Sequence, residues 1–206
     1  ISMPFKQAVI PLMDEVDHSA QVIGAVNTIV NTDGYLHAYN TDVIAVASLL
    51  KSHAVDPKLP FLLRGSGGMA AVAGAFYDAG FRAGTIIARN EAAGTALARR
   101  YGYAWAPEPG DLTAPVIVNV TPIGMSGGAE SEQLAYPQPT IEVASVVFDV
   151  VAMPVETPLI RAARAAGREV ITGGEVIALQ AAEQFRLYTG VTLSPDDIAQ
   201  AEAQTN

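Results

Sequence analysis

The chain has 206 residues, of which 50% are hydrophobic and 16% charged, a composition typical of a folded globular protein with a well-filled core. A net charge of −9 and a pI near 4.7 argue against a nucleic acid or an anionic membrane surface as partner. Without cysteine there is no disulfide or thiolate metal site, and the three histidines lack ligand spacing, so we predict no bound metal. No apolar stretch reaches the roughly 20 residues that span a bilayer, and we expect a cytoplasmic protein.

The first quarter of the chain predicts a small unit of helix and strand. Residues 5–16 are compatible with a helix interrupted near Pro11, and residues 25–30 form a β-rich run. Asn31-Thr32-Asp33-Gly34 is typical of a hairpin turn, so residues 35–39 are the predicted return strand. Residues 43–50 are predicted to be helical.

A glycine-rich loop follows the next apolar run. Residues 61–63 predict a buried strand, and Gly65-Ser66-Gly67-Gly68-Met69-Ala70 comes close to the G-x-G-x-x-G/A pattern of dinucleotide-binding βαβ units. Gly65 permits a tight turn, and Gly67 lacks the Cβ that would keep a pyrophosphate from the backbone. Residues 69–79 are the predicted helix whose N-terminus faces the phosphates.

The next strand, predicted at residues 85–88, ends where such folds select their cofactor. NAD sites commonly place Asp or Glu there, whereas this chain has Ala88 followed by Arg89. An arginine suits a 2′-phosphate, which favours NADP, although a solvated loop arginine is the alternative. Glu91 stands close by and would weaken the positive field.

The remainder alternates strands with helices, which predicts a doubly wound parallel sheet, that is, an α/β Rossmann fold. The predicted elements are a helix at 92–101, strands at 116–120 and 146–150, a helix at 158–166, a strand at 169–172, a helix at 175–188 and a peripheral helix at 195–204.

Several short motifs then occur in a distinctive order. Pro4-Phe5-Lys6, Gly24-Ala25-Val26-Asn27-Thr28 and Asn40-Thr41-Asp42 precede the glycine loop, and Asn119-Val120-Thr121-Pro122-Ile123-Gly124-Met125 follows it. Near the C-terminus come Thr157-Pro158-Leu159, Gly173-Gly174 and Gln180-Ala181-Ala182. In this order the chain resembles the shikimate dehydrogenase family over nearly its whole length.

The resemblance implies reversible, NADP-dependent hydride transfer between 3-dehydroshikimate and shikimate, or a close cyclic hydroxy acid. Lys6 would be the acid/base group and Asp42 its partner, because an amine and a carboxylate in one hydrogen-bond network can shuttle a proton. The alternatives are a surface lysine and a helix-capping aspartate. The substrate would lie between a small domain, residues 1–50 with the returning helices at 175–206, and an NADP-binding Rossmann domain, residues 58–174.

The remaining site residues also follow from the resemblance. Ser2, Asn27 and Gln180 would hydrogen-bond the substrate, since an amide offers both a donor and an acceptor. The cofactor-binding residues would be Gly65, Ser66, Gly67, Gly68, Met69, Arg89, Thr121, Ile123 and Met125, the last three on the nicotinamide side.

Some positions depart from the family pattern. Ala152 stands where the family usually has Tyr, Val176 replaces a frequent methionine, and Ala88-Arg89-Asn90 replaces Asn-Arg-Thr. The family's early strand with paired serines is absent, and the chain opens without an initiator methionine, so we expect that a segment precedes Ile1. A quinate or aminoshikimate dehydrogenase and a catalytically silent NADP-binding sensor remain alternatives, as monomer or homodimer.

Overall fold

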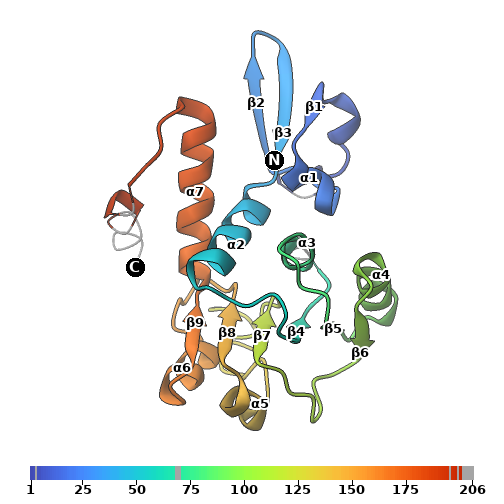
Figure 1. Ribbon diagram of the computed structural model, residues 1–206, viewed down its shortest axis with the longest axis vertical. Helices are drawn as coiled ribbons and strands as arrows, with labels where there is room; N and C mark the ends of the chain where they lie inside the picture. The colour runs from blue at the N-terminus through green and yellow to red at the C-terminus, as the bar shows by residue number, and fades with distance from the viewer. Residues whose placement is uncertain (3, 68–70, 195, 199, 201–206) are drawn as a thin grey trace.

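The computed structural model describes residues 1–2, 4–67, 71–194, 196–198 and 200, and every statement below concerns these residues (Figure 1). Two sheets lie at opposite ends of the molecule. Helices α2 (Thr41–Ser52) and α7 (Gly173–Thr189) run between them.

The smaller sheet has three strands in the order β1-β3-β2. Strands β2 (Thr28–Thr32) and β3 (Tyr35–Tyr39) form an antiparallel hairpin, and β1 (Glu15–Val16) pairs parallel to β3. The turn has positive φ at Asp33 and Gly34, a conformation that favours Asn, Asp and Gly. The predicted hairpin is confirmed.

The helix predicted over residues 5–16 is wrong. The chain instead forms turns, a 3-10 helix η1 (Ile10–Leu12), β1 and the short helix α1 (His18–Ile23). Pro11 cannot donate a backbone hydrogen bond, and Asp17 begins a new helix by accepting the Ser19 N–H at 2.8 Å. Met13 and Val16, which lie between them, pack against the small core of Ala20, Val26 and Ala38.

The larger sheet is entirely parallel, in the order β6-β5-β4-β7-β8-β9. This is the doubly wound order, with the switch of direction between β4 and β7, and it confirms the predicted Rossmann fold. Its elements are β4 (Phe61–Arg64), α3 (Ala71–Asp78), β5 (Gly84–Ile87), α4 (Glu91–Tyr101), β6 (Ala104–Ala106), β7 (Val116–Asn119), α5 (Gln138–Val143), β8 (Val146–Asp149), α6 (Pro158–Ala165) and β9 (Glu169–Ile171).

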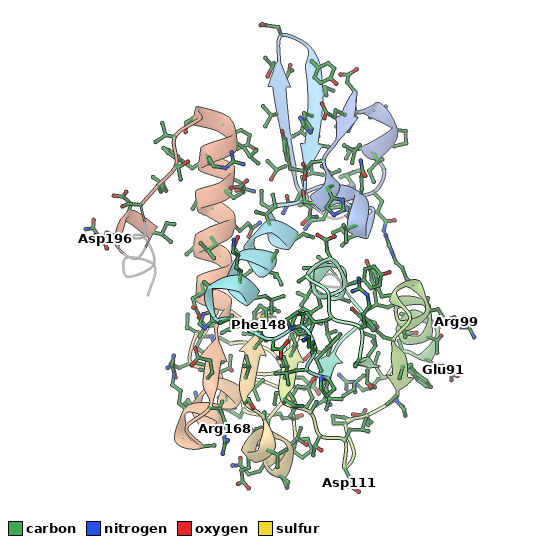
Figure 2. The ribbon with its side chains drawn as sticks, viewed as in Figure 1. Glu91, Arg99, Asp111, Phe148, Arg168 and Asp196 are labelled. Atoms are coloured by element: carbon green, nitrogen blue, oxygen red, sulfur yellow. The ribbon has the colours of Figure 1, made fainter. Side chains whose placement is uncertain are left out.

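Alternate side chains of these strands enter two cores, as the two-residue period of a strand requires. Phe61 and Leu63 join the core beneath α2, α3 and α4, whereas Leu62 joins the core beneath α5 and α6. Phe148 lies at the centre of the first core, and charged side chains such as Asp111 and Arg168 lie at the periphery (Figure 2).

Helix α2 belongs to the Rossmann core. Val43, Val46 and Leu49 are buried in the same cluster as Phe76 of α3 and the sheet. The division between residues 50 and 58 is therefore not visible in the packing, and it stays a prediction.

The C-terminal helices agree in part with the predicted ones. Helix α7 begins at Gly173, two residues before the predicted start, because Thr172 caps it by accepting the Glu175 N–H. Of the helix predicted at 195–204, residues 196–198 and 200 are helical and the others lie outside the described part of the chain. No helix among the described residues is long and apolar enough to cross a membrane.

Candidate active site

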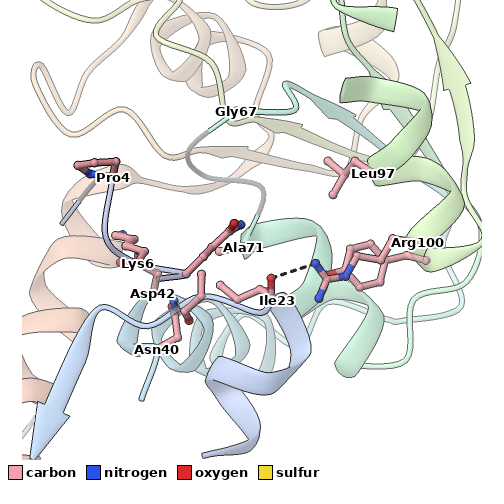
Figure 3. A pocket seen from close by; sticks show the side chains of 12 residues that line it. Pro4, Lys6, Ile23, Asn40, Asp42, Gly67, Ala71, Leu97 and Arg100 are labelled. Atoms are coloured by element: carbon pink, nitrogen blue, oxygen red, sulfur yellow. Dashed lines mark hydrogen bonds and ion pairs between the residues drawn. The ribbon is translucent and has the colours of Figure 1, made fainter. Parts of the chain in front are cut away.

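A cavity of about 380 Å³ lies between the small sheet and the Rossmann sheet (Figure 3). We call it the main cavity. Residues from both parts of the molecule line it, namely Pro4, Lys6, Gln7, Ile23, Ala25, Asn40, Asp42, Gly67, Ala71, Leu97, Arg100 and Tyr101. Two of the predicted site residues, Lys6 and Asp42, thus share it with the glycine loop.

Lys6 and Asp42 form an ion pair in this cavity. The Lys6 Nζ lies 3.4 Å from Asp42 Oδ2, and the two side chains are 24% and 8% exposed. The Lys6 backbone is held by its carbonyl, which accepts the Val26 N–H at 2.7 Å. The amine and the carboxylate, 36 residues apart in sequence, are placed together as the sequence predicts.

Asp42 stands in the first turn of α2, where a carboxylate is favoured by the positive end of the helix dipole. It is not the cap, because Asn40 holds that position and accepts the Val43 N–H at 3.2 Å. The Asn40 amide also donates to the Ala25 carbonyl at 2.9 Å. Asp42 is therefore free of the capping role that was its alternative.

In the side-chain amide of Asn27 the oxygen is hydrogen-bonded to described residues and the nitrogen is not. Its Oδ1 accepts hydrogen bonds from Thr28 Oγ1 (2.9 Å), Thr41 N (2.9 Å) and Thr41 Oγ1 (3.2 Å). Its Nδ2 is buried and has no partner among the described residues. The three bonds to Oδ1 fix the orientation of the amide and leave Nδ2 available to a ligand. An unpaired buried donor is costly, so a ligand that accepts from Nδ2 would be favoured.

The glycine loop opens into a second cavity of about 240 Å³, which we call the glycine-loop cavity. Gly65 has φ +125°, and a Cβ there would lie 2.7 Å from Val120 Cγ2, so no other residue fits. At Gly67 no atom of the described residues lies within 4 Å of the position of a Cβ, which leaves the backbone approachable. The cavity is lined by Arg64, Gly65, Ser66, Ile87, Ala88, Arg89, Asn90, Pro107 and Thr121. Gly68 and Met69 lie outside the described residues.

Arg89 borders the glycine-loop cavity, 62% exposed. Its guanidinium pairs with Glu130, on the loop after β7, at 3.3 and 3.5 Å. Asn90 caps α4 by accepting the Ala93 N–H at 3.0 Å, which fixes the chain just beyond Arg89. Sequence reasoning considered Glu91 as the weakening charge and missed Glu130, which is 41 residues away in the chain.

The three predicted cofactor-binding residues of the loop after β7 have different surroundings. Thr121 lines the glycine-loop cavity and donates its hydroxyl to Asn119 Oδ1 at 2.6 Å. The Ile123 side chain is only 2% exposed and packs in the core beneath α5 and α6. Met125 is exposed. Ile123 and Met125 are not among the residues that line either cavity, and their contact with the cofactor stays a prediction.

Ser2 and Gln180 also lie away from the main cavity lining. Ser2 is exposed, and its carbonyl accepts the Phe5 N–H at 3.0 Å. Gln180 is half-buried on α7. One turn later Gln184 donates to Thr28 Oγ1 at 3.2 Å and so reaches the Asn27 network, a contact that sequence reasoning missed.

A buried carboxylate anchors the end of β8. Asp149 accepts hydrogen bonds from Thr157 Oγ1 (2.7 Å), Asn119 Nδ2 (3.0 Å) and Val151 N (3.1 Å). Burial raises the pKa of Asp149 to about 6, and these three donors oppose the rise. Through Asn119 the carboxylate fixes the loop that carries Thr121.

Comparison with known proteins assigns the chain to a family. The model of the shikimate dehydrogenase substrate binding domain matches residues 1–29. A shikimate dehydrogenase-like protein of Haemophilus influenzae is 50% identical over 204 residues, covering 98% of this chain and 75% of the relative. The chain belongs to the shikimate dehydrogenase family. It is thus a shikimate dehydrogenase-like oxidoreductase, and the sequence resemblance is confirmed.

Two solved structures that resemble this chain contain a bound nucleotide. Shikimate 5-dehydrogenase of Thermus thermophilus, in complex with NADP(H) and shikimate, is 32% identical with a TM-score of 0.85, covering 100% of this chain and 77% of that one. Quinate dehydrogenase of Corynebacterium glutamicum, in complex with NAD, is 31% identical with a TM-score of 0.88 and the same coverage. The family fold therefore accommodates both nucleotides.

Proposed function

We propose that this protein interconverts 3-dehydroshikimate and shikimate with NADP. The observation that carries the proposal is the Lys6–Asp42 pair, which faces the same cavity as Gly67 and Ala71 at the start of α3. Acid/base groups and the glycine loop therefore meet across one cavity. Such a site combines a proton-transfer pair with a place for a dinucleotide.

The residues of the glycine-loop cavity fit NADP. Gly65 permits the tight turn, Gly67 leaves the backbone accessible to a pyrophosphate, and Arg89 supplies a cation where the 2′-phosphate would lie. When bound, the cofactor accepts or supplies the hydride. We expect Gly65, Ser66, Gly67 and Arg89 to hold it, with Thr121 at the side of the cavity.

Lys6 moves the proton that accompanies the hydride. In the reductive direction its ammonium donates a proton to the carbonyl oxygen, which becomes the hydroxyl; in the oxidative direction its neutral amine takes that proton back. Asp42, 3.4 Å away, orients the amine and stabilises its charged form. A position of the reacting oxygen within about 3 Å of Nζ is the geometric requirement.

Asn27 would orient the substrate through its free Nδ2, which donates to a ring hydroxyl. The three donors on Oδ1 keep that end of the amide from turning. Ser2 and Gln180 remain predicted substrate ligands.

Quinate is the second candidate substrate, because the NAD-bound quinate dehydrogenase aligns over the whole of this chain. The test is steady-state oxidation of shikimate and quinate with NADP and NAD in parallel, using the full-length protein and Lys6→Ala. Turnover of shikimate with NADP that is lost in Lys6→Ala supports the proposal. Preferred turnover of quinate selects the second candidate, and nucleotide binding without turnover of either acid supports the catalytically silent sensor.

A further inference from the structure

Arg89 and Glu130 meet as two planar groups. Arg89 Nη1 lies 3.5 Å from Glu130 Oε1, and Nη2 lies 3.3 Å from Oε2. This two-point arrangement is also the one that a guanidinium offers to a phosphate. The Glu130 carboxylate therefore occupies the Nη1–Nη2 edge of Arg89, one of the two-point edges that a phosphate at this side of the glycine-loop cavity would use.

Backbone hydrogen bonds anchor both partners. The Glu130 carbonyl accepts the N–H of Gly124 at 3.0 Å and of Gln133 at 3.2 Å, which fixes this part of the loop after β7. The residue before Arg89, Ala88, donates its N–H to Ala106 at 3.0 Å and accepts Trp105 Nε1 at 3.2 Å. The two charges are thus held within reach of each other by the fold.

The other arginine of the glycine-loop cavity cannot take over the role of Arg89. Arg64 is only 16% exposed, and it donates to the Ala135 carbonyl and to Glu108 Oε2, the latter at 3.1 Å. Arg89, at 62%, is exposed enough to change partner without rearranging the core.

We propose that Glu130 sets the nucleotide preference of the glycine-loop cavity by competing with the 2′-phosphate of NADP for Arg89. The inference rests on the proposed NADP-binding function. NADP can engage the Nη1–Nη2 edge of Arg89 only when the Arg89–Glu130 pair opens, whereas NAD has a hydroxyl at that position and leaves the pair intact. Glu130 therefore lowers the affinity for NADP and leaves the affinity for NAD nearly unchanged. As a result, the preference of the cavity for NADP over NAD is smaller than it would be without Glu130.

The test is the affinity of Glu130→Gln for NADP and NAD. Trp105, the only tryptophan, lies beside Ala88 and gives an intrinsic fluorescence signal for both titrations. Glu130→Gln should bind NADP about two- to fivefold more tightly, the factor that corresponds to an exposed ion pair, and NAD within about twofold of wild type. Glu132→Gln is the matched control, because Glu132 lies on the same loop, is 88% exposed, and has Arg161 as its cation at 4.0 Å.

A double-mutant cycle with Arg89→Ala distinguishes competition from simple repulsion. If Glu130 acts by holding Arg89, the gain in NADP affinity falls below about twofold in the Arg89→Ala background. An equal gain in both backgrounds, an equal gain for NAD, or no gain in either Glu130→Gln or Glu130→Ala overturns the inference while the proposed function stands. Failure of the wild-type protein to bind either nucleotide overturns the proposed function itself.

Discussion

Replacing Asp149 by Asn should change how stability depends on pH. Asp149 is fully buried, and its pKa is raised from 3.8 to about 6 by that burial. In Asp149→Asn the amide oxygen still accepts the Asn119 and Val151 donors, and the amide nitrogen can donate to the Thr157 hydroxyl. The variant thus removes the ionisation and keeps the bonds from Asn119 and Val151, while the hydrogen bond with Thr157 reverses its direction.

The sign follows from proton binding. Between pH 3.8 and about 6 the folded protein holds a proton on Asp149 that the unfolded chain has released, so stability falls as the pH rises through this window. The full displacement of the pKa corresponds to about 3 kcal/mol, and about 2 kcal/mol of it falls between roughly pH 4.5 and 7.5. Across that range Asp149→Asn should become about 2 kcal/mol more stable relative to wild type.

Urea unfolding at about pH 4.5, 6 and 7.5 measures this difference. The unfolding free energies of Asp149→Asn and wild type are subtracted at each pH, so that the contributions of the other titrating groups cancel. Glu142→Gln, an exposed carboxylate on α5, is the control and should parallel wild type at every pH. If the stability of Asp149→Asn also parallels that of wild type, the ionisation of the buried Asp149 does not set the pH dependence.

Three further predictions concern the ends of α2 and the packing near Arg89. His53 forms hydrogen bonds with Glu169 (2.8 Å) and Glu175 (3.0 Å). Burial lowers the pKa of His53, but the two glutamates raise it more, so its pKa is higher in the folded protein than in the unfolded chain. The two contacts therefore stabilise the folded state fully below pH 6.5, and this stabilisation is lost as the pH rises through the folded-state pKa. His53→Gln should therefore lower the unfolding free energy by about 1 kcal/mol near pH 6 and by less near pH 9, and an equal loss at both would contradict this. Gly94→Ala places a Cβ 2.4 Å from Trp105 Nε1, so it should cost about 1–3 kcal/mol in thermal unfolding and shift the Trp105 emission, and an unchanged spectrum would argue against the clash. Asp42→Asn should lower kcat at least tenfold yet cost no more than about 1 kcal/mol of stability, because Asn40 still caps α2; a kcat near that of wild type would exclude Asp42 from proton transfer.

The Rossmann half was predictable because its signals are local. The glycine loop, the apolar runs around Leu63 and Val118 and the alternation of strands with helices each arise from a few neighbouring residues. The hairpin at Asp33-Gly34 was predictable for the same reason. Lys6 and Asp42 came from motif order, and their approach across the cavity follows from the way the small sheet leads into α2.

The features that could not be predicted depend on packing and on contacts between residues far apart in the chain. The segment before Asp17 has apolar residues at helix-like spacing, yet it packs as irregular chain because Pro11 and the Asp17 cap divide it. No local pattern reveals that the Ile123 side chain packs in the core, and its contact with the cofactor stays a prediction. The partner of Arg89 is set by the folding of the loop after β7, so Glu130 could not be found from its neighbours in sequence.

In the proposed reaction Lys6 carries the proton that accompanies hydride transfer at the main cavity. The most direct test is single-turnover oxidation of shikimate at saturating NADP by wild type and Lys6→Ala, with NADP affinity measured through Trp105 in the same samples. We expect Lys6→Ala to lose about 10²- to 10⁴-fold in the rate of hydride transfer, with NADP affinity unchanged. A Lys6→Ala variant that transfers hydride at nearly the wild-type rate would contradict it.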